Sequence, residues 1–187
     1  MNYKSVYIDA GHGGIDPGCP LGKGEKYYNL GVATELQKLL QSQGYEAEMS
    51  RHGDKSLSLK QRCQMANSFY TGHGGVFVSI HHDAVIGRQA QGMTTYYCKG
   101  SDRGWKLAEA TRTAHRANMF DWPHEFRGTK EGNFYVLKHT KAPAILVECE
   151  FMTNEEQFDR IKQNEQEWFR HMAKLIFDSI KIFYSTK

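Results

Sequence analysis

One stretch near the N-terminus limits what this chain can fold into. The β-branched and aromatic run Val6 to Ile8 is typical of a buried strand, and a turn with glycines at positions 11, 13 and 14 follows it. Glycine allows a sharp turn and lets the backbone approach a ligand closely. His12 therefore stands where a strand ends, which is where α/β sheets bind their ligands. Taken alone, the stretch could equally be an ordinary turn with a surface histidine; a phosphate-binding loop would need a Gly-Lys-Ser/Thr ending, which is absent.

The hydrophobic pattern then alternates between the periods of helix and strand. Helical spacing is seen from Glu25 to Gly44 and from Leu57 to Gly72, and short apolar strands are expected at Tyr45 to Met49 and Val76 to Ile80. Strands and helices in this order predict right-handed crossovers and a largely parallel sheet.

The second half of the chain adds further elements to this sheet. We expect strands at Gly92–Cys98 and Ala144–Val147, a short edge strand at Phe134–Leu137, helices at Trp105–Met119 and from Glu155 onward, and a loop at Phe120–Glu131. The prediction is a three-layer α/β domain with about six strands flanked by helices. No repeat, low-complexity tract or linker interrupts residues 1–187, so we expect one domain without a separate binding module.

Composition excludes several classes of protein. The net charge of +3 comes without a Lys/Arg run, which argues against nucleic acid as a partner, and no apolar stretch approaches the length of a membrane span. The four cysteines are far apart and form no CxxC pair, so we expect free thiols in a chain made in the cytoplasm. Nor does the N-terminal sequence have the apolar region of a signal peptide.

Polar residues follow several of the predicted strands. His12, His81 and Glu148 each stand at the end of a strand, and Glu25 opens the first helix close to His12 in sequence. Because parallel strands end at the same edge of a sheet, we expect these side chains to meet. Two histidines and a carboxylate are the ligand set of a catalytic zinc, and a further glutamate can serve as its general base.

Spacing leaves some choices open. Glu25 could simply be an acidic residue favourable to the helix dipole. His81 and His82 would point to opposite faces of a strand, whereas Glu148 and Glu150 would share one, so spacing cannot select one member of either pair. The remaining histidines show no convergent spacing and are expected on the surface or in the core, with His73 in a turn.

Motifs along nearly the whole chain resemble one enzyme family. They are Ile8–Gly18, Gly24-Glu25 before a helix, Ser50-Arg51, Arg62, Val78–Ala84, and Pro143–Glu148 followed by Phe151–Asn154. In this order they are similar to the zinc-dependent N-acetylmuramoyl-L-alanine amidases of the amidase-3 type, which occur in bacterial cell-wall hydrolases and phage lysins.

The resemblance implies a role for each candidate. His12, Glu25 and His81 take the zinc-ligand positions, and Glu148 takes that of the catalytic glutamate. The implied reaction is hydrolysis of the amide between the lactyl group of N-acetylmuramic acid and L-alanine, with peptidoglycan as substrate. Arg127 is a candidate second electrophile, although a structural salt bridge is an equal alternative for it. The chain departs from the family at Glu150, where a small residue is usual; this carboxylate could raise the proton affinity of Glu148.

The lack of an export signal or cell-wall-binding repeat suggests a monomeric phage endolysin released through a holin, or else a catalytic domain taken from a longer protein. Two rival functions are a zinc peptidase that cuts within the stem peptide and a non-catalytic peptidoglycan-binding module. The second would lack a ligand or the catalytic glutamate, and all four residues are present.

Overall fold

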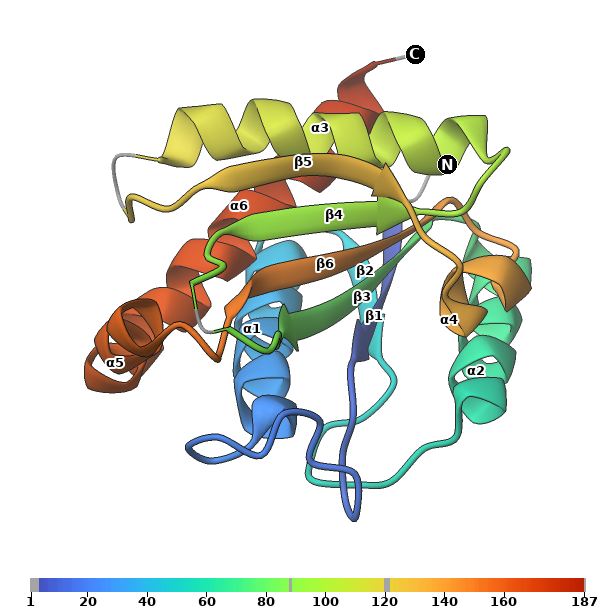
Figure 1. Ribbon diagram of the computed structural model, residues 1–187. Helices are drawn as coiled ribbons and strands as arrows, with labels where there is room; N and C mark the ends of the chain where they lie inside the picture. The colour runs from blue at the N-terminus through green and yellow to red at the C-terminus, as the bar shows by residue number, and fades with distance from the viewer. Residues whose placement is uncertain (1–3, 88, 120–121, 187) are drawn as a thin grey trace.

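Six strands form one mixed sheet at the centre of the computed structural model, which describes residues 4–87, 89–119 and 122–186 (Figure 1). The strands are β1 (Ser5–Ala10), β2 (Glu46–Met49), β3 (Val76–Asp83), β4 (Met93–Tyr97), β5 (Phe126–Glu131) and β6 (Ala144–Phe151). Their order across the sheet is β2-β1-β3-β6-β4-β5. β2, β1, β3 and β6 run parallel to one another. β4 is antiparallel to its neighbour β6, and β5 is parallel to β4.

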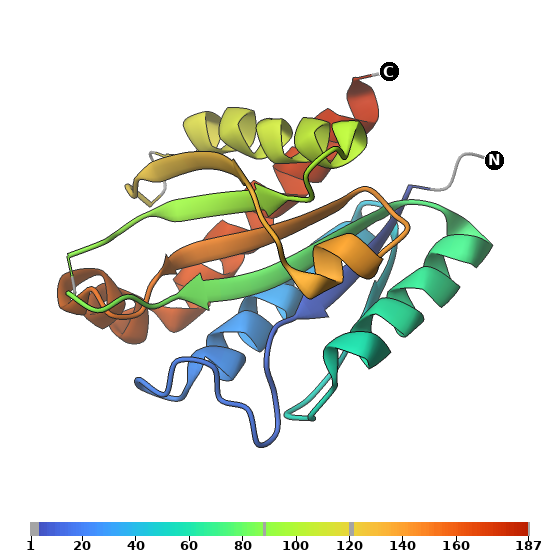
Figure 2. The ribbon, with the colours of Figure 1, turned by 45° about the vertical axis from the view of Figure 1, so that its right-hand side comes forward.

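Helices cover both faces of this sheet (Figure 2). They are α1 (Glu25–Ser42), α2 (Leu59–His73), α3 (Asp102–Asn118), α4 (Tyr135–His139), α5 (Glu155–Gln163) and α6 (Glu165–Ser185). Buried residues of α1, α3, α5 and α6 join one hydrophobic cluster, and those of α2 and α4 join a second on the opposite face. The predicted three-layer α/β fold is confirmed.

The alternation of side chains in β1 explains why there are two clusters. Val6 and Ile8 belong to the larger one, while Tyr7 points into the smaller one, and all three are almost completely buried. A parallel strand covered on both faces is mostly apolar, and β1 follows this rule except at the buried polar residues Ser5 and Asp9.

Local sequence sets where the helices begin. The Ser58 hydroxyl accepts a hydrogen bond from Gln61 N–H and the Gln61 side chain accepts one from Ser58 N–H, which is a capping box at the start of α2. The Asn154 side chain caps α5 by accepting from Gln157 N–H. α2 extends one residue beyond Gly72, so His73 ends a helix instead of lying in the turn.

Two predicted elements were wrong. Residues 126–131, expected as loop, form edge strand β5; Phe120 and Asp121 of the same predicted loop lie outside the described residues. Gly128 gave a turn signal there, but it sits in the strand with φ 105°, near a shift in the β4–β5 register. The expected edge strand at residues 134–137 is instead the short helix α4, because Val136 and Leu137 pack together against the α2 face.

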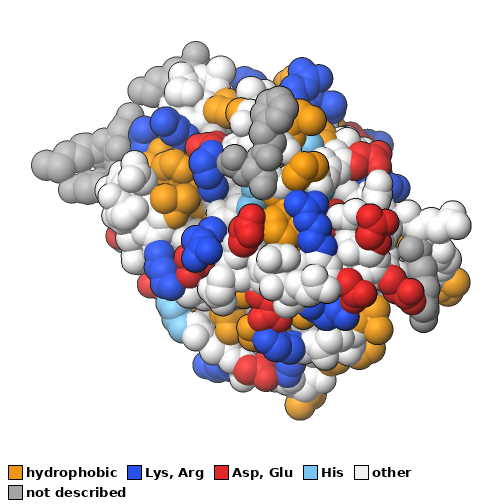
Figure 3. Space-filling view, turned by 90° about the vertical axis from the view of Figure 1, so that its left-hand side faces the viewer, with side chains coloured by type: hydrophobic (Ala, Val, Ile, Leu, Met, Phe, Trp, Pro, Cys, Tyr) orange, Lys and Arg blue, Asp and Glu red, His pale blue; other side chains and the backbone are white. Residues whose placement is uncertain are grey.

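The surface agrees with the mild net charge. On the face shown in Figure 3, acidic and basic side chains are interspersed and hydrophobic ones are scattered among them. Within the described residues, none of the helices combines the length and apolar character needed to cross a membrane.

Candidate metal centre and active site

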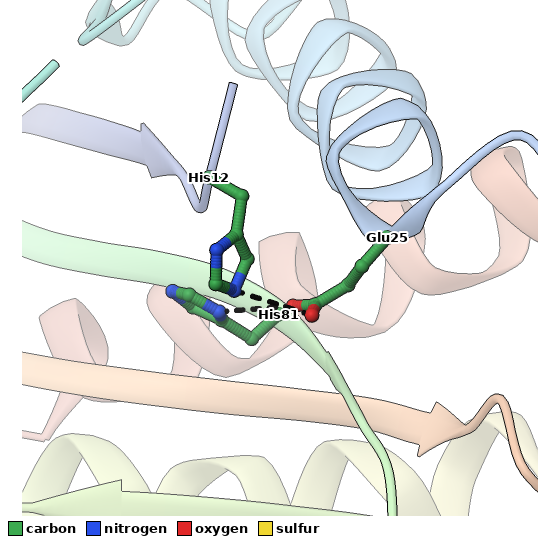
Figure 4. A group of neighbouring side chains, drawn as sticks. All are labelled: His12, Glu25 and His81. Atoms are coloured by element: carbon green, nitrogen blue, oxygen red, sulfur yellow. Dashed lines mark hydrogen bonds and ion pairs between the residues drawn. The ribbon is translucent and has the colours of Figure 1, made fainter. Parts of the chain in front are cut away.

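Three side chains from separate elements converge at the carboxyl edge of the sheet (Figure 4). His12 lies in the loop after β1, Glu25 is the first residue of α1, and His81 lies on β3. His12 Nε2 is 3.2 Å from Glu25 Oε2, and His81 Nδ1 is 3.0 Å from Glu25 Oε1. One ligand atom from each residue lies within 4.8 Å of the others, so the group could hold a metal ion.

His12 reaches this position through an uncommon backbone conformation. Its φ of 59° is left-handed, a region that residues other than glycine enter at a cost. Two buried arginines hold the loop in place. Arg62 donates to the carbonyl oxygens of Ala10 and His12, and Arg51 donates to those of Ala10 and Gly11. The loop therefore satisfies its backbone acceptors with side chains instead of a β-ladder.

Two glycines make room for the ligands. A Cβ atom at Gly11 would overlap the imidazole of His81, and one at Gly18 would overlap the Glu25 carboxylate and the His12 ring. At these two positions, any side chain would displace a candidate ligand.

Asp16 sets the tautomer of His12. Its carboxylate Oδ2 lies 2.8 Å from His12 Nδ1 and can only accept, so Nδ1 carries a proton and Nε2, which faces Glu25, is the nitrogen that could bind a metal after losing its own proton. A carboxylate behind a ligating histidine is the usual partner of this kind in metal sites. Burial alone would lower the pKa of His12, but its hydrogen bonds with Glu25 and Asp16 outweigh burial and raise the pKa.

The Glu25 carboxylate is buried and well supplied with donors. Oε1 accepts from Asn29 Nδ2 at 3.0 Å and from His82 N–H at 3.2 Å, and Oε2 accepts from Cys19 N–H at 3.1 Å. Burial would raise the pKa of Glu25, but the two facing histidines lower it, so the group is an anion ready to bind a cation.

Glu148 lies beside this group and has a different environment. It pairs with His81 in the β3–β6 register, and among the described residues its Oε2 atom has no hydrogen-bond partner although it is shielded from solvent. Burial, followed by the nearby charges of Asp83 and Glu25, raises the pKa of Glu148 well above its usual value. A carboxyl group with a raised pKa is suited to accept and release a proton during a reaction.

All four side chains line one cavity of about 610 Å³. Its lining also includes apolar residues from the segment before α2, the start of α2 and the α4 region: Leu57, Leu59, Phe134, Tyr135 and Val136. The cavity is large enough for part of an extended substrate and combines polar and apolar lining groups.

The structure distinguishes the members of the two pairs that spacing left open, His81 from His82 and Glu148 from Glu150. His82 points into the core, where its ring bonds to Asn29 and Trp168, away from the His12–Glu25–His81 group. Glu150 accepts hydrogen bonds from Gly92 and Phe151 N–H and does not line the cavity. Burial raises the pKa of Glu150.

Arg127 is not brought to the cavity in this structure. It lies exposed on β5, donates to the Gln91 carbonyl oxygen at 3.2 Å, and places its guanidinium 5.1 Å from the centre of the Phe151 ring. Among the described residues Arg127 forms no salt bridge either, since its partners there are a backbone carbonyl and an aromatic ring.

The sequence analysis did not predict the residues that hydrogen-bond to the candidate ligands and to their neighbours. Asp16 follows His12 by four residues, and Asn29 follows Glu25 by four residues on the same face of α1. The i,i+4 spacing of a helix was the available signal for Asn29. Trp168, more than eighty residues from His82 in sequence, gave no such signal.

The family follows from a match over nearly the whole chain. Residues 6–182 match the amidase-3 family, described as N-acetylmuramoyl-L-alanine amidase. The chain belongs to this family. N-acetylmuramoyl-L-alanine amidases of the amidase-3 family are zinc-dependent cell-wall hydrolases. The His12–Glu25–His81 donor set has the chemistry that zinc prefers, and its atoms lie close enough together to hold a metal ion.

Several amidases are similar to it in sequence and structure. An N-acetylmuramoyl-L-alanine amidase from Clostridium difficile 630 is 32% identical, with complete coverage of both chains and a TM-score of 0.89. The amidase AmiC2 of Nostoc punctiforme is also 32% identical, with 97% of each chain covered and a TM-score of 0.85. The protein named "Probable cell wall amidase LytH" of Staphylococcus epidermidis is 33% identical over 98% of this chain. The chain spans only 59% of the length of that protein.

Proposed function

We propose that this chain hydrolyses the amide bond between the lactyl group of N-acetylmuramic acid and the L-alanine of the stem peptide. The observation that carries the proposal is the meeting of a zinc-type ligand group with a carboxyl group of raised pKa in one cavity. Membership of the amidase family supplies the substrate class, peptidoglycan.

The proposed metal ligands are His12, Glu25 and His81. Bound there, zinc supplies a Lewis acid that makes water more acidic and stabilises negative charge on the carbonyl oxygen. Two histidines and one carboxylate leave a coordination position open, as catalytic sites require.

The proposed proton carrier is Glu148. Its raised pKa suits it to take a proton from the attacking water and to give that proton to the departing alanine amine. Asp83 contributes by its negative charge, which favours the protonated form of Glu148 after the first transfer.

The first test combines metal analysis with detection of the product. We expect one zinc per chain and release of peptides with N-terminal alanine from peptidoglycan, and we expect a chelator to stop the release. Cleavage elsewhere in the stem peptide would identify a zinc peptidase instead. Zinc-independent binding without any cleavage would identify a binding module.

The second test addresses Glu148 directly. Glu148→Gln should keep its zinc and its fold but lose about two to four orders of magnitude in rate, the usual contribution of a general acid–base group. Glu150→Gln, two residues along the same strand but outside the cavity, is the matched control and should retain most of the activity. Substantial turnover by Glu148→Gln would refute the assignment.

Three finer predictions from the sequence go with this proposal. We expect residues 1–187 to act as a single-domain monomer, and Arg127 would have to leave its carbonyl partner to stabilise charge in the reaction. The endolysin role also stays a prediction. It requires that the purified chain lyse sensitive cells when it reaches their wall, and that lysis from within depend on a co-expressed holin.

A further inference from the structure

A continuous row of hydrogen bonds runs from the last helix to a candidate metal ligand. The Trp168 indole N–H on α6 donates to His82 Nε2 at 3.0 Å, and His82 Nδ1 lies 2.8 Å from Asn29 Oδ1. Asn29 Nδ2 in turn donates to Glu25 Oε1 at 3.0 Å. The row thus joins α6, β3 and α1, and each of its four residues is at most 5% exposed.

The direction of each bond in the row is fixed by its first member. An indole N–H can only donate, so His82 Nε2 must accept and carries no proton. His82 is then neutral with its proton on Nδ1, and this N–H donates to Asn29 Oδ1. The Asn29 amide is thereby oriented with its NH₂ group toward Glu25.

A second contact agrees with this orientation of Asn29. Its Nδ2 also lies within hydrogen-bond distance of the Gly11 carbonyl oxygen, at 3.3 Å. If the amide were flipped, its oxygen would face both the Glu25 carboxylate and this carbonyl, and three acceptors would meet in a buried site. Such a site would leave buried acceptors unsatisfied, which is unfavourable.

We propose that Trp168, His82 and Asn29 are positioning residues that fix the Glu25 carboxylate for zinc. The inference rests on the proposed function, because it assumes that Glu25 is a ligand. The row holds Oε1 by two donors, the Asn29 amide and the His82 backbone N–H, and so fixes the orientation of the carboxylate that faces His12 and His81. Partners behind a ligand typically change metal affinity by 10–100-fold.

The closing experiment measures zinc affinity by competition with a fluorescent chelator. Trp168→Phe removes one N–H and leaves an aromatic ring in the core, and Asn29→Leu removes the amide itself. We expect zinc to bind about tenfold more weakly to the first variant and up to about 100-fold more weakly to the second. In assays saturated with zinc, kcat should fall while KM for muropeptide stays unchanged.

Trp122→Phe is the matched control. Trp122 is a buried tryptophan whose ring centre lies 5.3 Å from that of Trp168, but it has no place in the row. Its substitution should leave zinc affinity within about twofold of the wild type. An equal loss in both tryptophan variants would mean that core packing alone is responsible, and would overturn the proposal.

A measurement on the histidine itself separates this inference from the proposed function. Nitrogen-15 NMR of the metal-free wild type should show His82 protonated at Nδ1 and bare at Nε2, and Trp168→Phe should relax that preference. If the wild type fails to bind zinc, the proposed metal site is wrong whatever the tautomer. If the wild type binds zinc and Trp168→Phe binds it equally tightly, the metal site stands and the positioning row is refuted. Should Asn29→Leu fail to fold, the tryptophan pair and the tautomer still decide.

Discussion

Gly11 is the residue at which the metal centre has the least room for change. A methyl group there would occupy the space of the His81 imidazole, which lies against the backbone of the β1 loop. We expect Gly11→Ala to push His81 away from Glu25 and to weaken zinc binding by at least an order of magnitude, while the helical content is retained. Zinc titration followed by circular dichroism would check this. Gly53→Ala controls for the loss of a glycine as such, because Gly53, like Gly11, has no positive φ and no atom lies within 4 Å of the added methyl.

Arg62 makes the second residue-scale prediction. Its guanidinium forms a buried ion pair with Asp9 at 2.7 Å and also binds two carbonyl oxygens of the His12 loop. Arg62→Met would leave a buried carboxylate unpaired, so we expect a loss of about 3–5 kcal/mol in the free energy of unfolding. The partly exposed pair of Arg112 with Glu109 offers a control, since Arg112→Met should cost less than about 1 kcal/mol. If urea unfolding showed equal losses of stability in the two variants, Arg62 would not be the residue that holds the His12 loop.

At this scale, the sequence predicted which side chains meet but not how they are held. His12, Glu25, His81 and Glu148 could be placed at one edge because each was expected to follow a strand or open a helix, although β3 and β6 extend past His81 and Glu148. The choice of His81 over His82 came from resemblance to a family, and the structure supplies its physical counterpart, since His82 faces the core. Asn29 lies one helical turn from Glu25, a spacing that the sequence contains, whereas Trp168 depends on the tertiary packing of α6, which no local pattern contains.

Elements α3 and α6 enclose a group of histidines that makes the fold sensitive to acid. His171 on α6 is buried beside His124, and neither of its ring nitrogens has a described hydrogen-bond partner. Burial, followed by the positive neighbours His115, Lys174 and Arg160, lowers the pKa of His171 to about 4. Burial likewise lowers the pKa of His124 to about 4.

The sign of the pH effect follows from these values. Above the unfolded pKa near 6.5 both states are neutral and the histidines cost nothing. As the pH falls from about 6.5 toward 4, the unfolded chain binds protons that the folded chain excludes, so stability decreases by up to about 1.4 kcal/mol per pH unit for each group. We expect His171→Phe to be more acid-resistant than the wild type between pH 6.5 and pH 5 and similar to it at pH 8. Urea midpoints at these pH values would check the difference, and parallel profiles would contradict it.

The two wrongly predicted elements show where local patterns give way to packing. The apolar residues Val136 and Leu137 are as suitable for a strand as for a helix, and only their contact with α2 decides for α4. Residues 126–131 contain a charged, glycine-interrupted run that forms a strand because β4 offers an unpaired edge. Longer elements such as α1 and α6 were predictable because their periodicity extends over several turns.

For the whole molecule, zinc should act as a cross-link. The three proposed ligands lie on a loop, a helix and a strand, so their common metal would join β1, α1 and β3. A ligand that binds only the folded state stabilises it by about 4 kcal/mol at a thousandfold excess over its Kd. We therefore expect a chelator to lower the Tm reversibly and zinc to restore it. His81→Ala should show a Tm that no longer responds to either reagent; a zinc-dependent Tm in that variant would place the metal elsewhere.

The division of the active site along the chain has a consequence for its biosynthesis. All three proposed metal ligands lie within the first 81 residues, whereas Glu148 and Trp168 are made more than sixty residues later. The proposed metal ligands therefore emerge well before the carboxyl group that would move protons and the tryptophan at the far end of the row behind Glu25. Synthesis in this order would keep the proposed hydrolysis from starting before residue 148 has been made.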